Sequence, residues 1–222
     1  MLGHRNLATH LVYERMPAGV VIAGGYSTRF GDADKAVAPL AGVPMVRRVA
    51  DGIEGVIDEL VVNCRNAQRS AIADALSDFS PSVRFAIDTV PDAGPVAGIR
   101  TGLAACDHEY AAVVACDMPF VDPELVSYLL NRARGHDAAV PRFEGWLQTT
   151  HAVYRTDPMV RACDDALGRG ERRTVEPLSE LEYVVIEGSD LRDHGSLTSF
   201  ENLNTREEFE RAATTLAGDE RL

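Results

Sequence analysis

The sequence predicts a three-layer α/β fold in which a mostly parallel sheet is covered by helices on both faces. From about residue 18 to about residue 140, short apolar runs alternate with segments of helical periodicity. The runs at residues 20–23 and 111–116 consist entirely of apolar residues, as strands buried on both faces do. Alternating strands and helices form crossover units whose strands are parallel, so this order of elements predicts the fold class.

The first half of the chain shows the alternation most clearly. A helix is expected to begin near Pro44, because proline suits the first turn of a helix. Met45, Val49 and Ile53 follow it at helical spacing. The other elements expected before residue 110 are a strand at 60–63, a helix at 67–76, a strand at 83–87, a loop at 91–98 and a short helix ending at Leu103.

The second half contains two helices with recognisable start signals. Asp122 is the expected N-cap of a helix at residues 123–134, because an aspartate side chain can accept from free helix N–H groups. The C-terminal helix is expected at residues 205–216 and begins with a capping box, Thr205-Arg206-Glu207-Glu208. The remaining expected elements are strands at 111–116, 138–140, 146–154 and 183–186 and a helix at 157–167.

The length of 222 residues fits one α/β domain. We expect this domain to cover residues 17–217 and to follow an N-terminal extension at residues 1–16. Met16 stands directly before the expected domain and is an alternative start. The alternative is that residues 1–16 form an ordered N-terminal arm, and the sequence leaves this choice open.

Composition excludes several function classes. The 34 acidic residues exceed the 22 basic ones, and the net charge of −12 argues against a general nucleic-acid surface. No apolar run approaches the roughly 20 residues of a membrane helix, and the N-terminus lacks a signal-peptide layout, so a cytoplasmic location without a membrane partner is expected. The four cysteines form no CxxC pair, which predicts reduced thiols. The acidic excess also favours a high-salt habitat, where screening weakens self-repulsion.

Residues 19–35 carry the clearest sign of ligand binding. A predicted strand turns at Gly24-Gly25, where the missing Cβ atoms let the backbone approach a ligand closely. Lys35 is the only lysine of the chain, and its compact ammonium beside a glycine turn suits a phosphate group. The segment is neither a P-loop nor the dinucleotide fingerprint G-x-G-x-x-G, whose first two glycines are not adjacent. A turn without a ligand is the alternative.

Four positions follow the predicted strands at one edge of the sheet, and they are Gly24, Asn63, Asp88 and Asp117. Ligands bind at the carboxyl ends of the strands in this architecture. Asp117 is expected to bind Mg²⁺, which takes one or two protein carboxylates and keeps several waters. A turn or capping role is the alternative for Asp117, and a structural turn role is the alternative for Asp88.

The segment from Ile22 to Lys35 resembles a known signature. It reads IAGGYSTRFGDADK and is similar to the LAGGxxxRxGxxDK of molybdenum cofactor guanylyltransferases, with Ile22 in place of leucine. Alone, this motif indicates only the broader nucleotide-diphospho-sugar transferase-like nucleotidyltransferases, which have a Rossmann-like fold. Later segments resemble the family's motifs in the same order, and they are Asp88 with GPVAG at 94–98, CDMPF at 116–120, GERR at 170–173 and FENLNT at 200–205.

The resemblance implies an enzyme that transfers GMP from GTP to a molybdopterin-type cofactor and uses Mg²⁺. Cofactor-delivery or acceptor enzymes are then candidate protein partners. The implied catalytic residues are Arg29, Lys35 and Asp117, with Asp117 also the metal ligand. The implied nucleotide-binding residues are Ile22, Ala23, Gly24, Gly25, Lys35, Asn63, Asp88, Gly94 and Asp117. The candidate acceptor residues are Arg172, Arg173, Asn202 and Asn204, for which surface charge and loop pinning are the alternatives.

Three other functions remain open at this point. A CTP-dependent relative would make the cytosine dinucleotide, although its glycine turn is usually AAG and this chain has Ala23-Gly24-Gly25. A second alternative adds GMP to another phosphorylated acceptor, as in cobamide or deazaflavin synthesis. The third is a non-catalytic nucleotide-binding protein, which the joint presence of Arg29, Lys35 and Asp117 disfavours.

Overall fold

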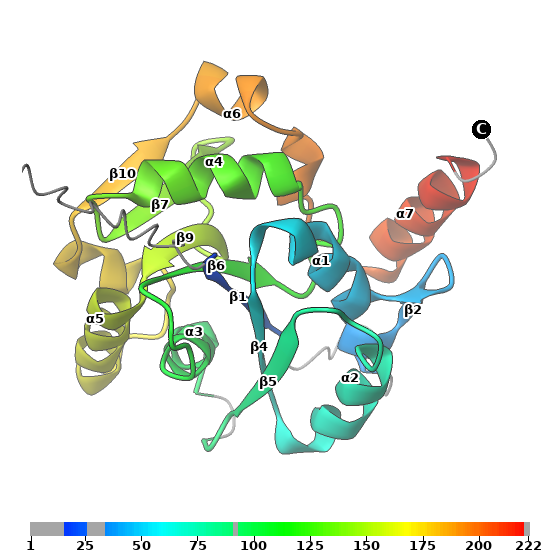
Figure 1. Ribbon diagram of the computed structural model, residues 1–222, viewed down its shortest axis with the longest axis horizontal. Coiled ribbons are helices and arrows are strands. Elements are labelled where there is room, and N and C mark those ends of the chain that lie inside the picture. Colours follow the sequence, from blue (N-terminus) through cyan, green and yellow to red (C-terminus); the bar gives the residue numbers. More distant parts are fainter. Residues whose placement is uncertain (1–15, 26–33, 91–92, 220–222) are drawn as a thin grey trace, which may run out of the picture.

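The computed structural model describes residues 16–25, 34–90 and 93–219, and these residues form a mixed sheet between two layers of helices (Figure 1). The boundary expected at residue 16 and the role of residues 1–15 therefore stay predictions. The strands of the large sheet are β1 (Ala18–Ile22), β4 (Glu59–Cys64), β5 (Ser82–Ile87), β6 (Tyr110–Ala115), β7 (Ala138–Phe143), β8 (Trp146–Leu147), β9 (His151–Arg155) and β10 (Tyr183–Ile186).

The sheet is mostly parallel, as predicted. Its strand order is β10-β7-β9-β6-β1-β4-β5, with β8 paired to β7. The neighbours β1, β4, β5 and β6 are parallel, whereas β9 runs antiparallel to both β6 and β7. A separate antiparallel pair is formed by β2 (Pro39–Leu40) and β3 (Val43–Pro44).

The single strand predicted at residues 146–154 is wrong. The structure divides it into β8 and β9, which are joined by a turn from which the N–H of His151 donates to the carbonyl of Gln148. β8 instead forms a hairpin with β7 through Glu144 and Gly145, whose φ angles are 50° and 84°. Two central residues with positive φ are the geometry of a tight hairpin turn, which reverses the chain.

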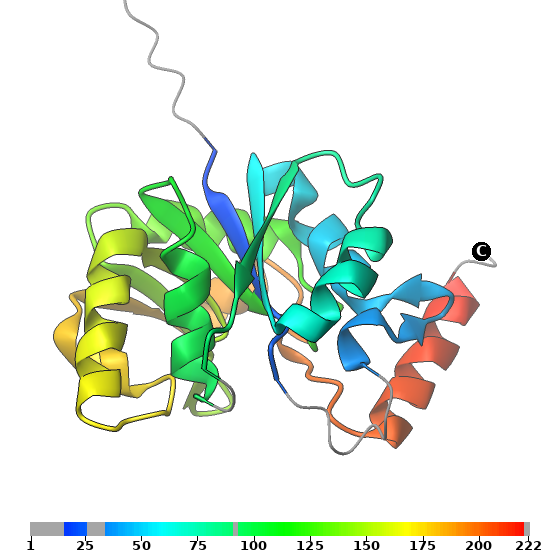
Figure 2. The ribbon, with the colours of Figure 1, turned by 90° about the horizontal axis from the view of Figure 1, so that it is seen from below.

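Helices cover both faces of the sheet. The helices are α1 (Met45–Ile53), α2 (Arg69–Ala75), α3 (Pro95–Leu103), α4 (Pro123–Ala133), α5 (Thr156–Gly168), α6 (Ser189–Asp193) and α7 (Arg206–Asp219). On one face, the side chains of α1, α2 and α4 share one core with alternate residues of the strands. On the other face, α3 and α5 lie side by side and enclose a second core (Figure 2).

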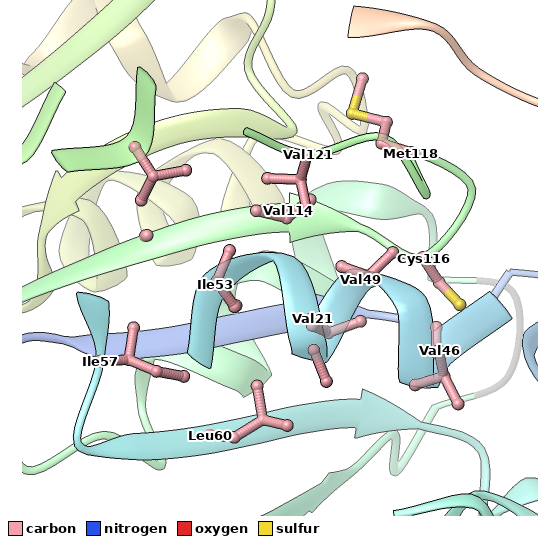
Figure 3. Packing of buried hydrophobic residues seen from close by; sticks show 14 of the residues in the cluster. Val21, Val46, Val49, Ile53, Ile57, Leu60, Val114, Cys116, Met118 and Val121 are labelled. Carbon is pink, nitrogen blue, oxygen red and sulfur yellow. The ribbon is translucent and has the colours of Figure 1, made fainter. Parts of the chain in front are cut away.

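The packing of α1 shows why the chain forms these layers. Its buried residues Val46, Val49 and Ile53 recur at helical spacing and face the sheet (Figure 3). There they meet Val21 of β1, whereas the preceding residue Val20 belongs to the core on the opposite face. A strand that is apolar at successive positions therefore buries both of its faces, which favours the central position of β1 in the sheet.

Both predicted helix starts are confirmed. Asp122 Oδ1 accepts from the N–H of Glu124 at 2.8 Å. Thr205 and Glu208 form the capping box, in which Glu208 N–H donates to Thr205 Oγ1 at 3.2 Å and Glu208 Oε2 accepts from Thr205 N–H at 2.8 Å. Within the part of the chain that the structure describes, no helix has the length and apolar character needed to cross a membrane. The four cysteines are free thiols, as expected.

Candidate active site

The backbone aligns the ends of the central strands at one edge of the sheet. Immediately after β1, the N–H of Ala23 donates to the carbonyl of Asn63 at 2.8 Å. After β5, the N–H of Asp88 donates to the carbonyl of Cys64 at 3.0 Å. Asp117 follows β6 two residues past its end. The predicted convergence of Gly24, Asp88 and Asp117 at this edge follows from the parallel register.

Asp88 lies directly beneath the glycine turn. A Cβ atom added to Gly24 would stand 2.3 Å from Asp88 Oδ2, which only a residue without a side chain avoids. The other carboxylate oxygen, Asp88 Oδ1, accepts from Asn63 Nδ2 at 2.7 Å. The same nitrogen donates to the carbonyl of Ala86 at 3.2 Å. Gly24 is therefore required by the position of Asp88, and Asn63 sets the orientation of the carboxylate.

The expectation that Asn63 follows the end of a strand is wrong. Asn63 is the penultimate residue of β4 and is fully buried. It is enclosed because β4 is a central strand, paired to β1 on one side and to β5 on the other. The amide of Asn63 thus contacts the site from within the sheet.

Lys35 and Asp117 form an ion pair. A short 3₁₀-helix, η1 (Lys35–Val37), starts at Asp34, whose Oδ1 accepts from the N–H of Ala36 at 3.1 Å. This cap places Lys35 so that its Nζ lies 3.1 Å from Asp117 Oδ2. The side chains retain 14% and 26% of their exposure, so the pair is partly shielded but reachable from solvent. The ammonium of the chain's single lysine is thus set against a carboxylate at the edge of the sheet.

The C-terminal FENLNT segment docks against the other side of Asp117. The N–H of Leu203 donates to the carbonyl of Asp117 at 2.9 Å. Asn202 Nδ2 donates to the carbonyl of Phe200 at 3.3 Å, so this side chain does pin the loop. Asn204 lies on the exposed side of the segment. Asn202 and Asn204 therefore flank Leu203, whose backbone is hydrogen-bonded to that of Asp117.

Gly94 and Arg172 lie next to each other, although they belong to separate motifs. Gly94 is the N-cap residue of α3, and a Cβ atom added there would stand 3.3 Å from Arg172 Cβ. Arg172 and Arg173 are both exposed. A hydrogen bond between the hydroxyls of Thr149 and Thr174 joins the residue after this segment to the turn before β9. The GERR segment thus borders the site on the side of α3.

Gln68 contacts this edge of the sheet and was not predicted from the sequence. It is 3% exposed, and its Nε2 donates both to the carbonyl of Ala23 and to Asp34 Oδ1, each at 3.0 Å. The available signal was a glutamine three positions after the N-cap residue of η3 (Asn66–Gln68), where its Oε1 accepts from the N–H of that residue. That signal was obscured because the N-cap residue is Arg65, whereas the common pattern begins with serine or threonine.

The donor set at this edge fits one weakly held hard cation. No group of three or more His, Cys, Asp or Glu side chains suited to a metal occurs in the described ranges. Asp117 offers a partly exposed carboxylate there, and Mg²⁺ is compatible with a single protein carboxylate when phosphate and water supply the other ligands. The neighbouring Cys116 is buried, which raises the pKa of its thiol far above neutral pH and keeps it protonated.

Several predicted residues are therefore brought together, and one is not described. The residues that meet at this edge are Ile22, Ala23, Gly24, Lys35, Asn63, Asp88 and Asp117, with Gly25 exposed beside them. Arg29 lies outside the described residues. The assembly combines a glycine turn, one ammonium and two carboxylates at the carboxyl edge of a parallel sheet, which suits a nucleotide with its phosphates.

Comparison with known proteins decides between the families that share this architecture. The family described as the MobA-like NTP transferase domain matches residues 19–182. The chain belongs to this family. It is a nucleotidyltransferase, and the match covers the glycine turn, both site aspartates and the GERR segment.

Individual relatives agree with this assignment. The chain is 54% identical over 199 residues to a protein of Natronomonas pharaonis named "probable molybdenum cofactor guanylyltransferase", covering 90% of this chain and 98% of that one. A protein of the same name from Haloferax mediterranei is 41% identical, and the match covers 85% of this chain and 89% of that one. The crystal structure of molybdopterin-guanine dinucleotide biosynthesis protein A from Archaeoglobus fulgidus has a TM-score of 0.74 at 25% identity. The match covers 90% of this chain and 99% of that one.

Proposed function

We propose that this chain is a molybdenum cofactor guanylyltransferase, which transfers GMP from GTP to the terminal phosphate of Mo-molybdopterin and releases pyrophosphate. The observation that carries the proposal is the Lys35–Asp117 pair, 3.1 Å apart beside a glycine turn. It occurs in a chain that is 54% identical to a relative of that name. The glycine turn reads Ala23-Gly24-Gly25, which favours GTP over CTP.

The glycine turn and Lys35 are assigned to the triphosphate. The backbone N–H groups of Gly24 and Gly25, which follow Ile22 and Ala23, can form an anion-binding concavity. In phosphoryl transfer the protein mainly positions the reactants and stabilises developing negative charge. Lys35 supplies a positive charge for the phosphates once GTP competes with Asp117 for its ammonium. Arg29 is assigned a similar role from its place in the motif.

Asp117 is assigned as the ligand of Mg²⁺. When bound, this ion would neutralise charge on the triphosphate oxygens. The residue suits the role because its carboxylate is partly exposed and its backbone is fixed on the other side by Leu203. Pairing with Lys35 holds the carboxylate in place before the nucleotide arrives.

The base and the acceptor are assigned to opposite ends of the site. Asp88 and Asn63 belong to the nucleotide side, where a carboxylate can accept from the N–H donors of guanine. Gly94 is assigned to the nucleotide as well, at the start of α3. Arg172 and Arg173 would meet the phosphate of the molybdopterin, and Asn202 and Asn204 would face the pterin. Delivery and acceptor enzymes in the cytoplasm are the expected protein partners.

The test is a transfer assay with each nucleoside triphosphate and molybdopterin, in which the dinucleotide product is identified by mass. The proposal predicts the guanine dinucleotide from GTP and little product from CTP or ATP. A cytosine dinucleotide would instead support the CTP-dependent alternative. Binding of GTP without any transfer would support the non-catalytic one.

A further inference from the structure

The carboxamide of Gln68 links the residue before the glycine turn to the residue before Lys35. Its Nε2 donates at 3.0 Å to the carbonyl of Ala23, which precedes the glycine turn, and at 3.0 Å to Asp34 Oδ1. Asp34 directly precedes Lys35 and caps the short helix that contains it. Gln68 is 3% exposed, so these bonds lie in a shielded environment where they are stronger than in water.

The orientation of this carboxamide is fixed from its other side. Gln68 Oε1 accepts from the backbone N–H of Arg65 at 2.9 Å and from Arg65 Nε at 3.1 Å. The oxygen therefore faces Arg65, and the NH₂ group must face Ala23 and Asp34. Each half of the carboxamide thus has its own task. The oxygen caps η3, and the nitrogen links Ala23 to Asp34.

From this arrangement we propose that Gln68 is a positioning residue, which sets the place of Lys35 relative to the glycine turn and thereby acts on the triphosphate. The inference rests on the proposed function insofar as it names the triphosphate as the group affected. Gln68 acts on Lys35 through Asp34, whose carboxylate both accepts from Gln68 and caps η1. Loss of the Gln68 donor group releases the Asp34 carboxylate and the η1 cap that carries Lys35.

One substitution separates the two halves of the carboxamide. Gln68→Glu keeps an oxygen facing Arg65, and glutamate is as suitable as glutamine at this position of a capping box. It replaces only the NH₂ group, so that a carboxylate oxygen faces both the Ala23 carbonyl and the Asp34 carboxylate. Like charges at hydrogen-bonding distance repel strongly when they are buried. A role confined to capping η3 predicts no effect of this substitution on Lys35.

The first readout is independent of any reaction. Because Lys35 is the only lysine, protein labelled with ¹³C and ¹⁵N lysine gives one side-chain amine signal. We expect Gln68→Glu to shift this signal. Adding Asp34→Asn should bring it back toward the wild-type position, since the amide introduced at position 34 can donate to the new carboxylate. Gln148→Glu, at the only other glutamine, is the matched charge control and is expected to leave the signal in place.

The second readout is the kinetics of GMP transfer. We expect Gln68→Glu to lower kcat/KM for GTP by roughly 10–100-fold at pH 8, as loss of a buried bond to a charged group does. The defect should shrink as the pH falls toward 6, because the introduced carboxyl group, once protonated, again donates a hydrogen bond. In the double variant the pH dependence should weaken. A packing role does not predict this profile, since the side chains have the same shape.

The outcomes separate the two proposals. If the wild type transfers no GMP but the lysine signal of the Gln68→Glu variant differs from that of the wild type, the proposed function fails and the positioning role stands. If the folded Gln68→Glu variant keeps the wild-type signal and the wild-type kcat/KM, the positioning role is overturned. Should that variant not fold in a thermal melt, Gln68→Met removes the same donor without adding charge, and an unchanged lysine signal there also overturns the proposal.

Discussion

The Nζ of Lys35 lies 3.1 Å from Asp117 Oδ2, although 82 positions separate the two residues in the chain. The pair lies where the start of η1 meets the turn after β6, and both side chains are only partly exposed. In the proposed reaction, the ammonium of Lys35 would move onto a phosphate when a divalent cation occupies the Asp117 carboxylate. This relationship leads to the first prediction.

Lys35→Ala and Asp117→Ala should each lower kcat for GMP transfer by about 10²–10³-fold or more, because Lys35 is assigned to offset negative charge in the transition state and Asp117 to hold the Mg²⁺ that does the same. The measurement is a steady-state transfer assay with GTP, accompanied by thermal melting to show that the fold persists. Asp164→Ala is the matched control, because it removes one member of an exposed ion pair with Arg100. Wild-type rates in either site variant would contradict the catalytic assignment.

Gly24→Ala should weaken GTP binding by roughly 10–100-fold, because a Cβ atom 2.3 Å from Asp88 Oδ2 forces the carboxylate or the turn to move. Calorimetric titration with GTP gives the affinity. Gly55→Ala is the control, since a Cβ atom there meets nothing within 4 Å. Equal affinities of the Gly24 variant and the wild type would show that the position of Asp88 does not matter for the nucleotide.

GTP should stabilise the protein against heat more than CTP or ATP does. The reason is that Asp88, held by Asn63 at 2.7 Å, is assigned to the donors of guanine. A ligand at 100 times its Kd adds about 2.7 kcal/mol to the free energy of unfolding. For a chain of this size each kcal/mol raises Tm by about 2–4 °C. Equal shifts by all three nucleotides would disprove base selection, and Asp88→Ala should reduce the preference.

His151 should make the fold less stable in mild acid. Burial lowers the pKa of His151 from 6.5 to about 4, and this is the main cause of the shift. The imidazole of His151 therefore binds a proton below about pH 6.5 in the unfolded chain, but only below about pH 4 in the folded chain. The part of the unfolding free energy that depends on neutral His151 is fully present above pH 6.5. It is lost as the pH falls toward 4, at up to about 1.4 kcal/mol per pH unit.

The measurement is urea unfolding at constant ionic strength between about pH 7.5 and pH 5, which spans most of this window. His151→Gln should flatten the pH dependence of the unfolding free energy. His194→Gln is the control, because His194 is exposed and stacks on Tyr128 at the surface. Identical slopes in the wild type and the His151 variant would exclude this residue as the cause.

Salt should stabilise the protein. The excess of acidic over basic residues, 34 against 22, leaves repulsion that dissolved ions screen. We expect both Tm and the transfer rate to rise between about 0.1 M and 2 M KCl. A protein that is at least as stable and as active in low salt would refute the inference of a high-salt habitat.

The order of most strands and helices is readable from the sequence alone, because apolar periodicity and capping residues act locally. The apolar run in β1, the Asp122 cap and the Thr205–Glu208 capping box were all readable within a few positions. The same reasoning placed Gly24, Asp88 and Asp117 at one edge, because parallel strands carry their carboxyl ends to the same side.

Which polar groups meet at the edge of the sheet depends on the three-dimensional arrangement of the chain. The direction of β9 depends on a two-residue turn at Glu144 and Gly145, which reverses the chain after β7. Gln68 reaches Ala23 across 45 positions and Asp34 across 34. A buried amide chooses its partners by geometry in three dimensions, and no periodicity along the chain records that choice.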